Sequence, residues 1–196
     1  MSEKKRIIVG ISGASGAPIA LELLRQLRQN REEAEVHLVM TQGALLTMQA
    51  ETGQDKEAAA ALADYVYEPS DMAAAIASGS FRSAGMIVVP CSMKTLAGIC
   101  SGYSDNLLLR CADVMLKERR RLVLVPRESP FNTIHLRNMY ELSQMGAVIL
   151  PPVLSYYQNP SSLEDCTLHI VGKIMDQFDL KCEGFCRWNG ADKISE

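Results

Sequence analysis

The sequence predicts an α/β protein in which helices cover both faces of a doubly wound parallel sheet, giving a three-layer sandwich. Five short runs rich in β-branched and aliphatic residues recur along the chain, and each is followed by a stretch with helical spacing. Two of the runs, MIVVPC and LVLVP, are almost continuously apolar and do not alternate with polar residues. That pattern is typical of strands buried on both faces of a parallel sheet.

The predicted elements alternate in order from the N-terminus. Strands are predicted at 6–12, 36–41, 86–91, 122–127 and 147–151. Pro18, together with the apolar residues Leu23 and Leu27, predicts a helix directly after the first strand. The alanine-rich segment 56–77 predicts a helix followed by a short strand-like stretch.

The final long helix is predicted from the pattern SSLE, in which Ser161 caps the helix and Glu164 reaches back to the cap. Its apolar face is predicted to consist of Leu163, Cys166, Ile170, Ile174 and Phe178.

Length, charge and hydropathy narrow the class of protein. We expect one domain over residues 1–196, because a chain of this length buries roughly 70% of its unfolded surface and needs no metal or disulfide to support its core. The formal charge of −3 lacks the basic excess that binding to nucleic acid requires. No apolar run approaches the ~20 residues of a membrane span, and MSEKKR leads into a strand instead of a secretory apolar region. The expected location is the cytoplasm, with neither nucleic acid nor membrane as a partner.

Six scattered cysteines show no spacing typical of a zinc site, so reduced thiols are expected. The alternative is that Cys182 and Cys186, four residues apart, pair or bind a metal.

The strongest local motif is the glycine-rich turn GISGASGAP at 10–18, which joins a strand to the beginning of a helix. Small residues let backbone N–H groups approach an anion, and Ser12 or Ser15 could add a hydroxyl donor. The turn lacks the lysine of a P-loop and does not fit the dinucleotide spacing, which favours a mononucleotide. A tight turn without a ligand is the alternative.

A second turn, PCSMKT at 90–95, follows the third of these strands, and two such turns at the carboxyl ends of parallel strands define a ligand crevice. Alternatively, Ser92 and Thr95 only cap the next helix. Cys91 could be a nucleophile, but without a recognisable histidine partner a buried cysteine is favoured.

Charged residues form a third cluster. Arg110 and Lys117 are spaced to share a helix face, whereas 119–121 is interpreted as a solvated basic helix end. Arg127 and Glu128 follow a buried strand between two prolines, where functional side chains of open α/β sheets collect. The three histidines are each given a structural interpretation: His37 lies in a strand, and His135 and His169 lie on helices.

Four long segments together resemble the flavin prenyltransferase family of the UbiX type, including members encoded beside phenolic and hydroxyarylic acid decarboxylases as an accessory component. The segments are SGASGAP, GMIVVPCSMKTLAGI, CADVMLKERRRLVLVPRESPF and IHLRNMYELSQMGAVILPP, in the family's order over nearly the whole chain. The resemblance implies a flavodoxin-like fold and a homododecamer whose active site lies where three subunits meet. It also implies a reaction without metal, in which the dimethylallyl group of dimethylallyl monophosphate is transferred to N5 and C6 of reduced FMN. The product, prenylated FMN, would serve a UbiD-type decarboxylase.

The resemblance also assigns site residues. FMN-binding positions match Gly13, Ala14, Ser15, Thr41, Ser92, Met93, Lys94, Thr95 and Arg127. Positions that bind the prenyl donor match Arg110, Lys117, Arg127, Tyr157, Lys173 and Trp188, the last an aromatic that closes over the site. The catalytic set implied is Ser15, Glu51, Lys117, Glu128 and Tyr157, with Glu51 and Glu128 moving protons in an order left open. In the absence of a metal, arginine, lysine and tyrosine donors would neutralise the leaving phosphate.

One departure from the family is Met72, which stands where some members carry tryptophan, so that this segment is not expected to supply aromatic support to an allyl cation. Two other functions are alternatives: an FMN-dependent decarboxylase of peptidyl-cysteine or phosphopantothenoylcysteine, and a non-catalytic accessory protein of a hydroxyarylic acid decarboxylase. The decarboxylase would need a catalytic histidine, which the segment 41–52 lacks. The accessory protein would have no need for the charged residues Glu51, Lys117, Arg127 and Glu128 or for Tyr157. The sequence leaves open whether the donor is a monophosphate or a pyrophosphate.

Overall fold

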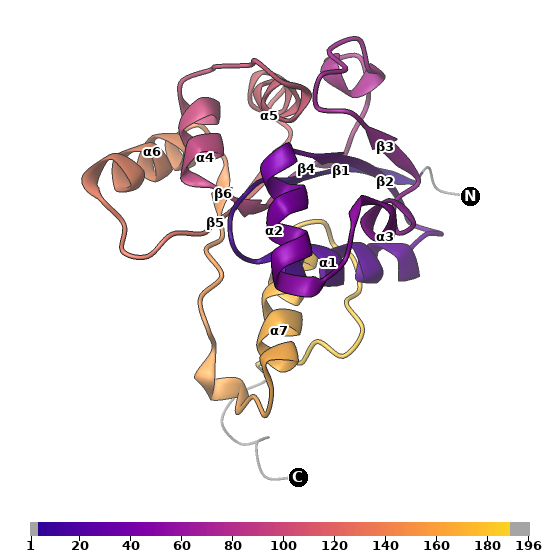
Figure 1. Ribbon diagram of the computed structural model, residues 1–196, viewed down its shortest axis with the longest axis vertical. Helices are drawn as coiled ribbons and strands as arrows, with labels where there is room; N and C mark the ends of the chain where they lie inside the picture. The colour runs from indigo at the N-terminus through magenta and orange to yellow at the C-terminus, as the bar shows by residue number, and fades with distance from the viewer. Residues whose placement is uncertain (1–3, 189–196) are drawn as a thin grey trace.

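The computed structural model describes residues 4–188 and shows a six-stranded parallel sheet with helices on both faces (Figure 1). The strands are β1 (Lys5–Ile11), β2 (Ala34–Met40), β3 (Tyr65–Tyr67), β4 (Gly85–Cys91), β5 (Arg121–Pro126) and β6 (Val148–Ile149). The helices are α1 (Ala17–Gln29), α2 (Gln42–Thr52), α3 (Lys56–Ala60), α4 (Met93–Cys100), α5 (Leu107–Lys117), α6 (Thr133–Gln144) and α7 (Leu163–Asp176), with 3-10 turns η1 (Ala75–Ala77) and η2 (Tyr156–Gln158).

The strand order is β3-β2-β1-β4-β5-β6, with every neighbouring pair parallel. All five strands predicted from the sequence are present, and the strand-like stretch in the alanine-rich segment is the short edge strand β3. Without β3, the remaining strands follow the order 2-1-3-4-5, which is that of a flavodoxin-like sheet. The order reverses between β1 and β4, and in such sheets ligands bind outside the carboxyl ends of the strands at that point.

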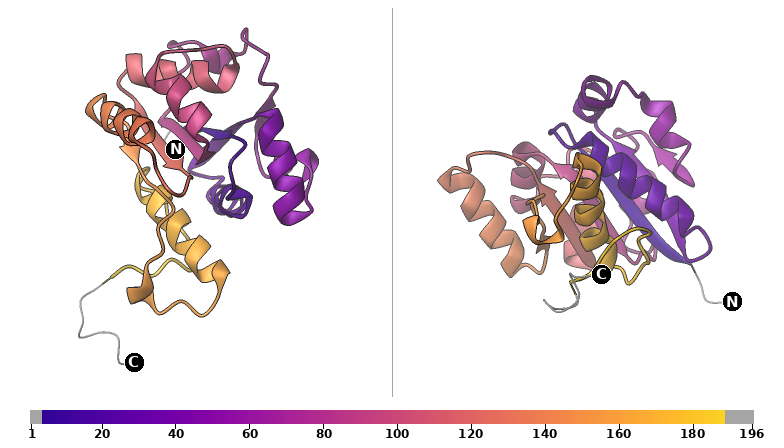
Figure 2. Two further views of the ribbon diagram at one scale, coloured as in Figure 1. Left: turned by 60° about the vertical axis from the view of Figure 1, so that its left-hand side comes forward. Right: turned by 90° about the horizontal axis from the view of Figure 1, so that it is seen from below.

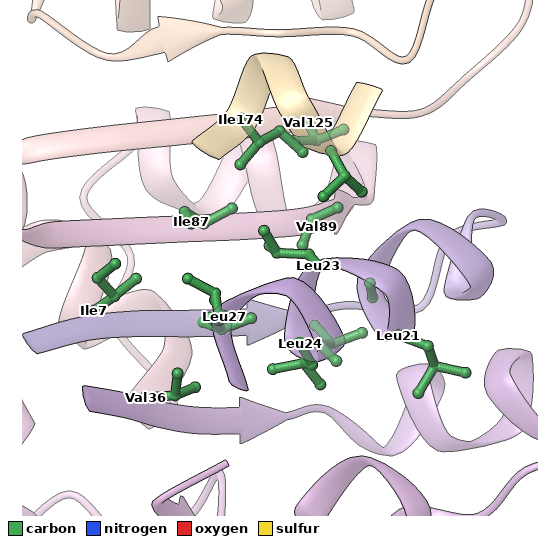
Figure 3. Close-up of a cluster of buried hydrophobic side chains, with 14 of the residues drawn as sticks. Ile7, Leu21, Leu23, Leu24, Leu27, Val36, Ile87, Val89, Val125 and Ile174 are labelled. Atoms are coloured by element: carbon green, nitrogen blue, oxygen red, sulfur yellow. The ribbon is translucent and has the colours of Figure 1, made fainter. Parts of the chain in front are cut away.

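The core lies on both faces of the sheet, because successive side chains of a strand point to opposite sides. On β1, Ile7 and Val9 pack with α1 and α7, whereas Ile8 packs with α4 and α5 on the other face. Figure 3 shows the first cluster, in which leucines of α1 and Ile174 of α7 cover the strands. Figure 2 shows α1 and α7 side by side on that face.

The last long helix begins one residue later than predicted. Ser162, not Ser161, caps α7, and the residue that reaches back is Asp165, not Glu164. The Asp165 carboxylate accepts hydrogen bonds from both serine N–H groups and from the Ser161 hydroxyl, at 2.7–3.1 Å, which explains the shift. In this register Leu163 is 72% exposed, so its place on the apolar face was predicted wrongly, whereas Ile170, Ile174 and Phe178 are buried.

The basic run after α5 is not entirely a solvated helix end. Arg120 donates hydrogen bonds to the carbonyl oxygens of Gly79 and Phe81, and so ties the segment before β4 to the end of α5. Arg119 and Arg121 are exposed, as predicted. Among residues 4–188, none of the helices has the length and apolar character needed to cross a bilayer.

Candidate functional site

The turns after β1 and β4 are joined by Ser12. Its hydroxyl donates to the carbonyl oxygen of Pro90 at 2.8 Å and accepts from the N–H of Ser92 at 2.8 Å. Because Ser12 is only 1% exposed and both bonds are internal, the idea that it could donate to a phosphate is wrong. Ser15 is half-buried and is therefore the more accessible of the two hydroxyls.

Glu51, from the end of α2, occupies the amino end of α1. One carboxylate oxygen accepts hydrogen bonds from the N–H groups of Gly16 at 2.9 Å and Ala17 at 2.8 Å, and the Ser15 hydroxyl lies close enough to favour the charged form. Partial burial raises the pKa of Glu51, but the bonds from Ser15, Gly16 and Ala17 and the charge of Arg127 outweigh this effect and lower it. The carboxylate is therefore ionised at neutral pH, and the chain itself supplies the anion at this helix end.

The amino end of α4 keeps donors available. Ser92 caps the helix by accepting from the N–H of Thr95 at 3.2 Å, and its hydroxyl donates to the Thr95 hydroxyl at 3.0 Å. Ser92 therefore caps the helix as the structural alternative expects, whereas Thr95 is the residue whose N–H is capped. Within residues 4–188, no hydrogen bond engages the N–H groups of Met93 and Lys94, so the same turn also presents two backbone donors and a helix dipole to an anion.

The turn after β2 approaches the glycine-rich turn closely. Thr41 caps α2 by accepting from the N–H of Ala44 at 3.2 Å. A Cβ atom added to Gly13 would lie only 2.9 Å from Cα of Gly43, so glycine is needed for the two turns to touch. Backbone and hydroxyl groups at the carboxyl ends of β1, β2 and β4 thus lie together at the switch point of the sheet, where the strand order reverses.

Arg127 and Glu128 complete this edge of the sheet. The N–H of Arg127 donates to the carbonyl oxygen of Cys91 at 3.1 Å, which fixes the loop to the end of β4, and its side chain is exposed. Glu128 is also exposed, and its carboxylate accepts from the N–H of Ser129 at 3.0 Å. Cys91 is fully buried, and burial raises the pKa of its thiol far above the usual range, which confirms the structural interpretation.

A second cluster lies on the exposed side of α7. The Tyr157 ring packs edge-on against His169, with ring centroids 5.8 Å apart, and against Trp188, with centroids 5.5 Å apart. Lys173, one turn further along α7, is exposed, and its charge acts on His169.

Arg110 and Lys117 form a third group, on the side of α5 that faces 77–79. The Arg110 guanidinium donates to the carbonyl oxygen of Ala77 at 3.1 Å and pairs with Asp113 at 2.7 Å, while Lys117 pairs with Glu118. The two residues share a face, as predicted. Lys117 ends α5 shortly before β5 begins, and no hydrogen bond or ion pair within 4–188 joins this group to the other two.

Within one chain, the structure therefore brings together most of the predicted FMN residues but not the predicted donor-binding residues. Met72 is 43% exposed and is in none of the three groups. Sequence reasoning missed the capping role of Glu51 and the contact of His169 with Tyr157. The second had a signal, because His169 stands four residues before Lys173 and thus on the same helix face. Among the described residues, no cluster of three or more histidine, cysteine or acidic side chains is placed to hold a metal ion.

Fold and site together define a mononucleotide-binding protein with a flavodoxin-like sheet. Over residues 1–177, the chain matches the family model described as "Flavoprotein". It is 52% identical over 185 residues to a protein of Sedimentibacter hydroxybenzoicus named "probable UbiX-like flavin prenyltransferase", an alignment that covers 94% of this chain and 97% of the relative.

Two solved structures have the same fold with a TM-score of 0.92. One is described as a dodecameric FMN-dependent UbiX-like decarboxylase from Escherichia coli O157:H7. It is 51% identical to this chain, and the alignment covers 94% of this chain and 100% of the E. coli chain. The other is AnUbiX (PadA1) in complex with FMN and dimethylallyl pyrophosphate. It is 52% identical to this chain, and the alignment covers 96% of this chain and 99% of AnUbiX. The chain belongs to the flavoprotein family, as a UbiX-like flavin prenyltransferase, which confirms the resemblance seen in the sequence.

Proposed function

We propose that this flavin prenyltransferase transfers the dimethylallyl group of dimethylallyl monophosphate to N5 and C6 of reduced FMN and releases prenylated FMN and phosphate. One observation carries the proposal: an ionised carboxylate, Glu51, is held beside Ser15 and Arg127 and next to a helix end with free N–H groups. Such a site can bind an anionic flavin and can also accept a proton from it. The proposed recipient of the product is a UbiD-type decarboxylase.

The residues at the switch point suit FMN. We assign its phosphate to the turn of Ser92, Met93, Lys94 and Thr95, because this turn has unused backbone donors whereas the amino end of α1 is occupied by Glu51. The remaining flavin contacts are assigned to Gly13, Ala14, Ser15, Thr41 and Arg127. When bound, reduced FMN supplies the nucleophilic ring positions.

The phosphate of the prenyl donor is assigned to Arg110, Lys117, Arg127, Tyr157 and Lys173. Arginine, lysine and tyrosine donors can neutralise charge that develops as the C–O bond breaks. Since Arg110 and Lys117 have their contacts with Ala77, Asp113 and Glu118 and none with the other donors among residues 4–188, a neighbouring subunit is proposed to supply them. A homododecamer, as described for the E. coli relative, provides such neighbours.

Proton transfer is assigned to Glu51 and Glu128. Glu51 is assigned the proton taken from the flavin through Ser15, because its carboxylate is already ionised and lies beside that hydroxyl. Glu128 lies on the next strand end, exposed, where it can take the proton released from the isoprenoid adduct during ring closure. Trp188 beside Tyr157 is proposed to cover the prenyl group.

The proposal includes one flavoprotein domain over 1–196 and a location in the cytoplasm. The location is supported by the six cysteines, all of which are unpaired, including Cys182 and Cys186.

The decisive experiment is anaerobic incubation of the purified protein with reduced FMN and dimethylallyl monophosphate, without added metal, followed by mass analysis of the released flavin. We expect a gain of one C5 unit and release of phosphate. A parallel reaction with dimethylallyl pyrophosphate tests the identity of the donor. Bound FMN without an adduct from either donor would instead favour an FMN-dependent decarboxylase, and failure to bind flavin would favour an accessory protein.

A further inference from the structure

His169 is a titratable residue at the proposed donor site to which the proposed function gives no role. Its Nε2 atom lies 3.5 Å from the hydroxyl oxygen of Tyr157, and the two rings meet edge-on. On its other side, the imidazole contacts the ring of Phe185, with centroids 5.4 Å apart. The side chain is half-buried, whereas Tyr157 is 53% exposed.

The C-terminal segment, residues 185–188, holds His169 and Tyr157 in place. Phe185 packs onto α7 at Gly172, where a Cβ atom would overlap the phenyl ring. Arg187 lies over that ring, 5.1 Å from its centroid, and pairs with Asp176 of α7. Together with the contact between Trp188 and Tyr157, these contacts restrict the rings of His169 and Tyr157 on the side away from α7.

The pair has complementary hydrogen-bonding groups. A tyrosine hydroxyl that donates its proton to a phosphate oxygen keeps lone pairs that can accept a second hydrogen bond. A neutral imidazole protonated at Nε2 is a suitable donor to that oxygen. Burial, and next the charge of Lys173, lower the pKa of His169, so the ring is neutral at physiological pH and donates from one nitrogen only.

We infer that His169 is a positioning residue for the prenyl donor: its Nε2–H donates to the Tyr157 oxygen and thereby directs the tyrosine hydroxyl toward the phosphate. His169 itself does not touch the phosphate. The inference rests on the proposed function in one respect, because that function assigns Tyr157 to the phosphate.

The test is a double-mutant cycle on anion binding, using the FMN-loaded, assembled protein and sulfate as the probe. Sulfate is a dianion over the whole working pH range, so its own titration does not affect the result. We expect Tyr157→Phe and His169→Leu each to weaken sulfate binding about 3- to 10-fold, the effect of one lost hydrogen bond. The double variant should be no weaker than Tyr157→Phe alone, because His169 acts through the tyrosine.

Two further variants separate positioning from folding. His169→Gln places an amide N–H near the position of Nε2 and should restore most of the affinity that His169→Leu loses. His135→Gln, on the exposed amino end of α6, should bind sulfate like the wild type. In the prenylation assay, His169→Leu should raise KM for dimethylallyl monophosphate about 3- to 10-fold with little change in kcat.

Three results would overturn the inference: no sulfate binding by the wild type, unchanged binding by His169→Leu, or losses that multiply in the double variant. A wild type that binds sulfate but forms no prenylated FMN would refute the proposed function. The sulfate cycle would still decide the role of His169, because it does not depend on turnover.

Discussion

At the scale of single residues, Glu51 links the structure of the glycine-rich turn to its proposed chemistry. Its carboxylate caps α1 through Gly16 and Ala17 and lies beside the Ser15 hydroxyl. Capping bonds are strongest when the acceptor is charged, and the same bonds hold the pKa of Glu51 below its ordinary value. A proton accepted at Glu51 therefore weakens the cap, which favours its return to Ser15 or to solvent.

Glu128→Gln should retain FMN but lose prenylated product. The substitution preserves the size of the side chain and removes its ability to accept a proton, so we expect a fall in product formation of about 10²- to 10⁴-fold. Flavin retention is measured by absorbance after gel filtration, and product by mass analysis. Glu57→Gln, an exposed glutamate on α3, serves as the control. Wild-type yield from Glu128→Gln would remove Glu128 from the proposed mechanism.

His37 makes stability depend on pH. It is 3% exposed, and its ring nitrogens lie 2.9 Å from the Tyr67 hydroxyl and 2.9 Å from the Glu35 carboxylate. Burial lowers the pKa of His37 from its ordinary 6.5, an effect that the hydrogen bond and charge of Glu35 only partly offset. Below pH 6.5 the unfolded chain therefore binds a proton more readily than the folded chain, so the free energy of unfolding decreases as the pH falls.

The prediction is tested by denaturant unfolding at about pH 7.5 and about pH 5.5, on either side of the ordinary histidine pKa. His37→Asn keeps an amide group near the position of Nδ1 for Tyr67 but does not titrate. We expect a smaller loss of unfolding free energy between the two pH values for this variant than for the wild type. Equal losses in both proteins would show that other groups control the acid sensitivity.

At the scale of elements, α7 depends on a glycine for its contact with the C-terminal segment. Alanine normally stabilises a helix relative to glycine by about 1 kcal/mol. At Gly172, however, the added methyl group overlaps the Phe185 ring. We expect Gly172→Ala to destabilise the protein by about 1–3 kcal/mol, as overpacking does, measured by thermal unfolding. Gly172→Ala combined with Phe185→Ala should recover stability relative to Phe185→Ala alone, and a further loss would contradict the packing argument.

Elements that depend on local patterns could be predicted from the sequence. Continuous apolar runs identified β4 and β5 because both faces of these strands are buried. The cap of α7 was predicted one residue too early, because Ser161 and Ser162 offer the same hydroxyl and only the position of Asp165 decides between them. The capping of α1 by Glu51 was not predictable from a pattern, since it joins backbone groups to a side chain 35 residues away in the sequence.

At the scale of the whole molecule, the proposed donor site is divided among separate surfaces of the chain. Lys117 lies at the end of α5, whereas Tyr157 and Lys173 lie beside the C-terminal segment. Large apolar side chains next to Tyr157 are exposed, including Val153 at 67% and Tyr156 at 78%. Exposed apolar surface of this kind is typical of a contact between subunits.

Assembly of the site from two subunits predicts complementation. Lys117→Ala and Lys173→Ala should each be nearly inactive alone. After subunit exchange between the two variants in equal amounts, about a quarter of the sites should contain both wild-type lysines, provided that each site takes them from different chains. Activity is measured as prenylated flavin per subunit, and each variant exchanged with itself is the control. Absence of recovery, with exchange verified by native mass spectrometry, would place both lysines on one chain.

The carboxylate at the amino end of α1 also has a consequence for the catalytic cycle. Because Glu51 acts as an internal counter-ion, the positive end of this helix is satisfied by the chain and does not need a flavin to keep its shape. Loading FMN is then a docking event onto a formed surface, without the entropic cost of ordering a disordered loop. A flavin prenyltransferase releases its flavin after each reaction. A flavin site that stays folded after one flavin has left and before the next has bound therefore suits repeated turnover.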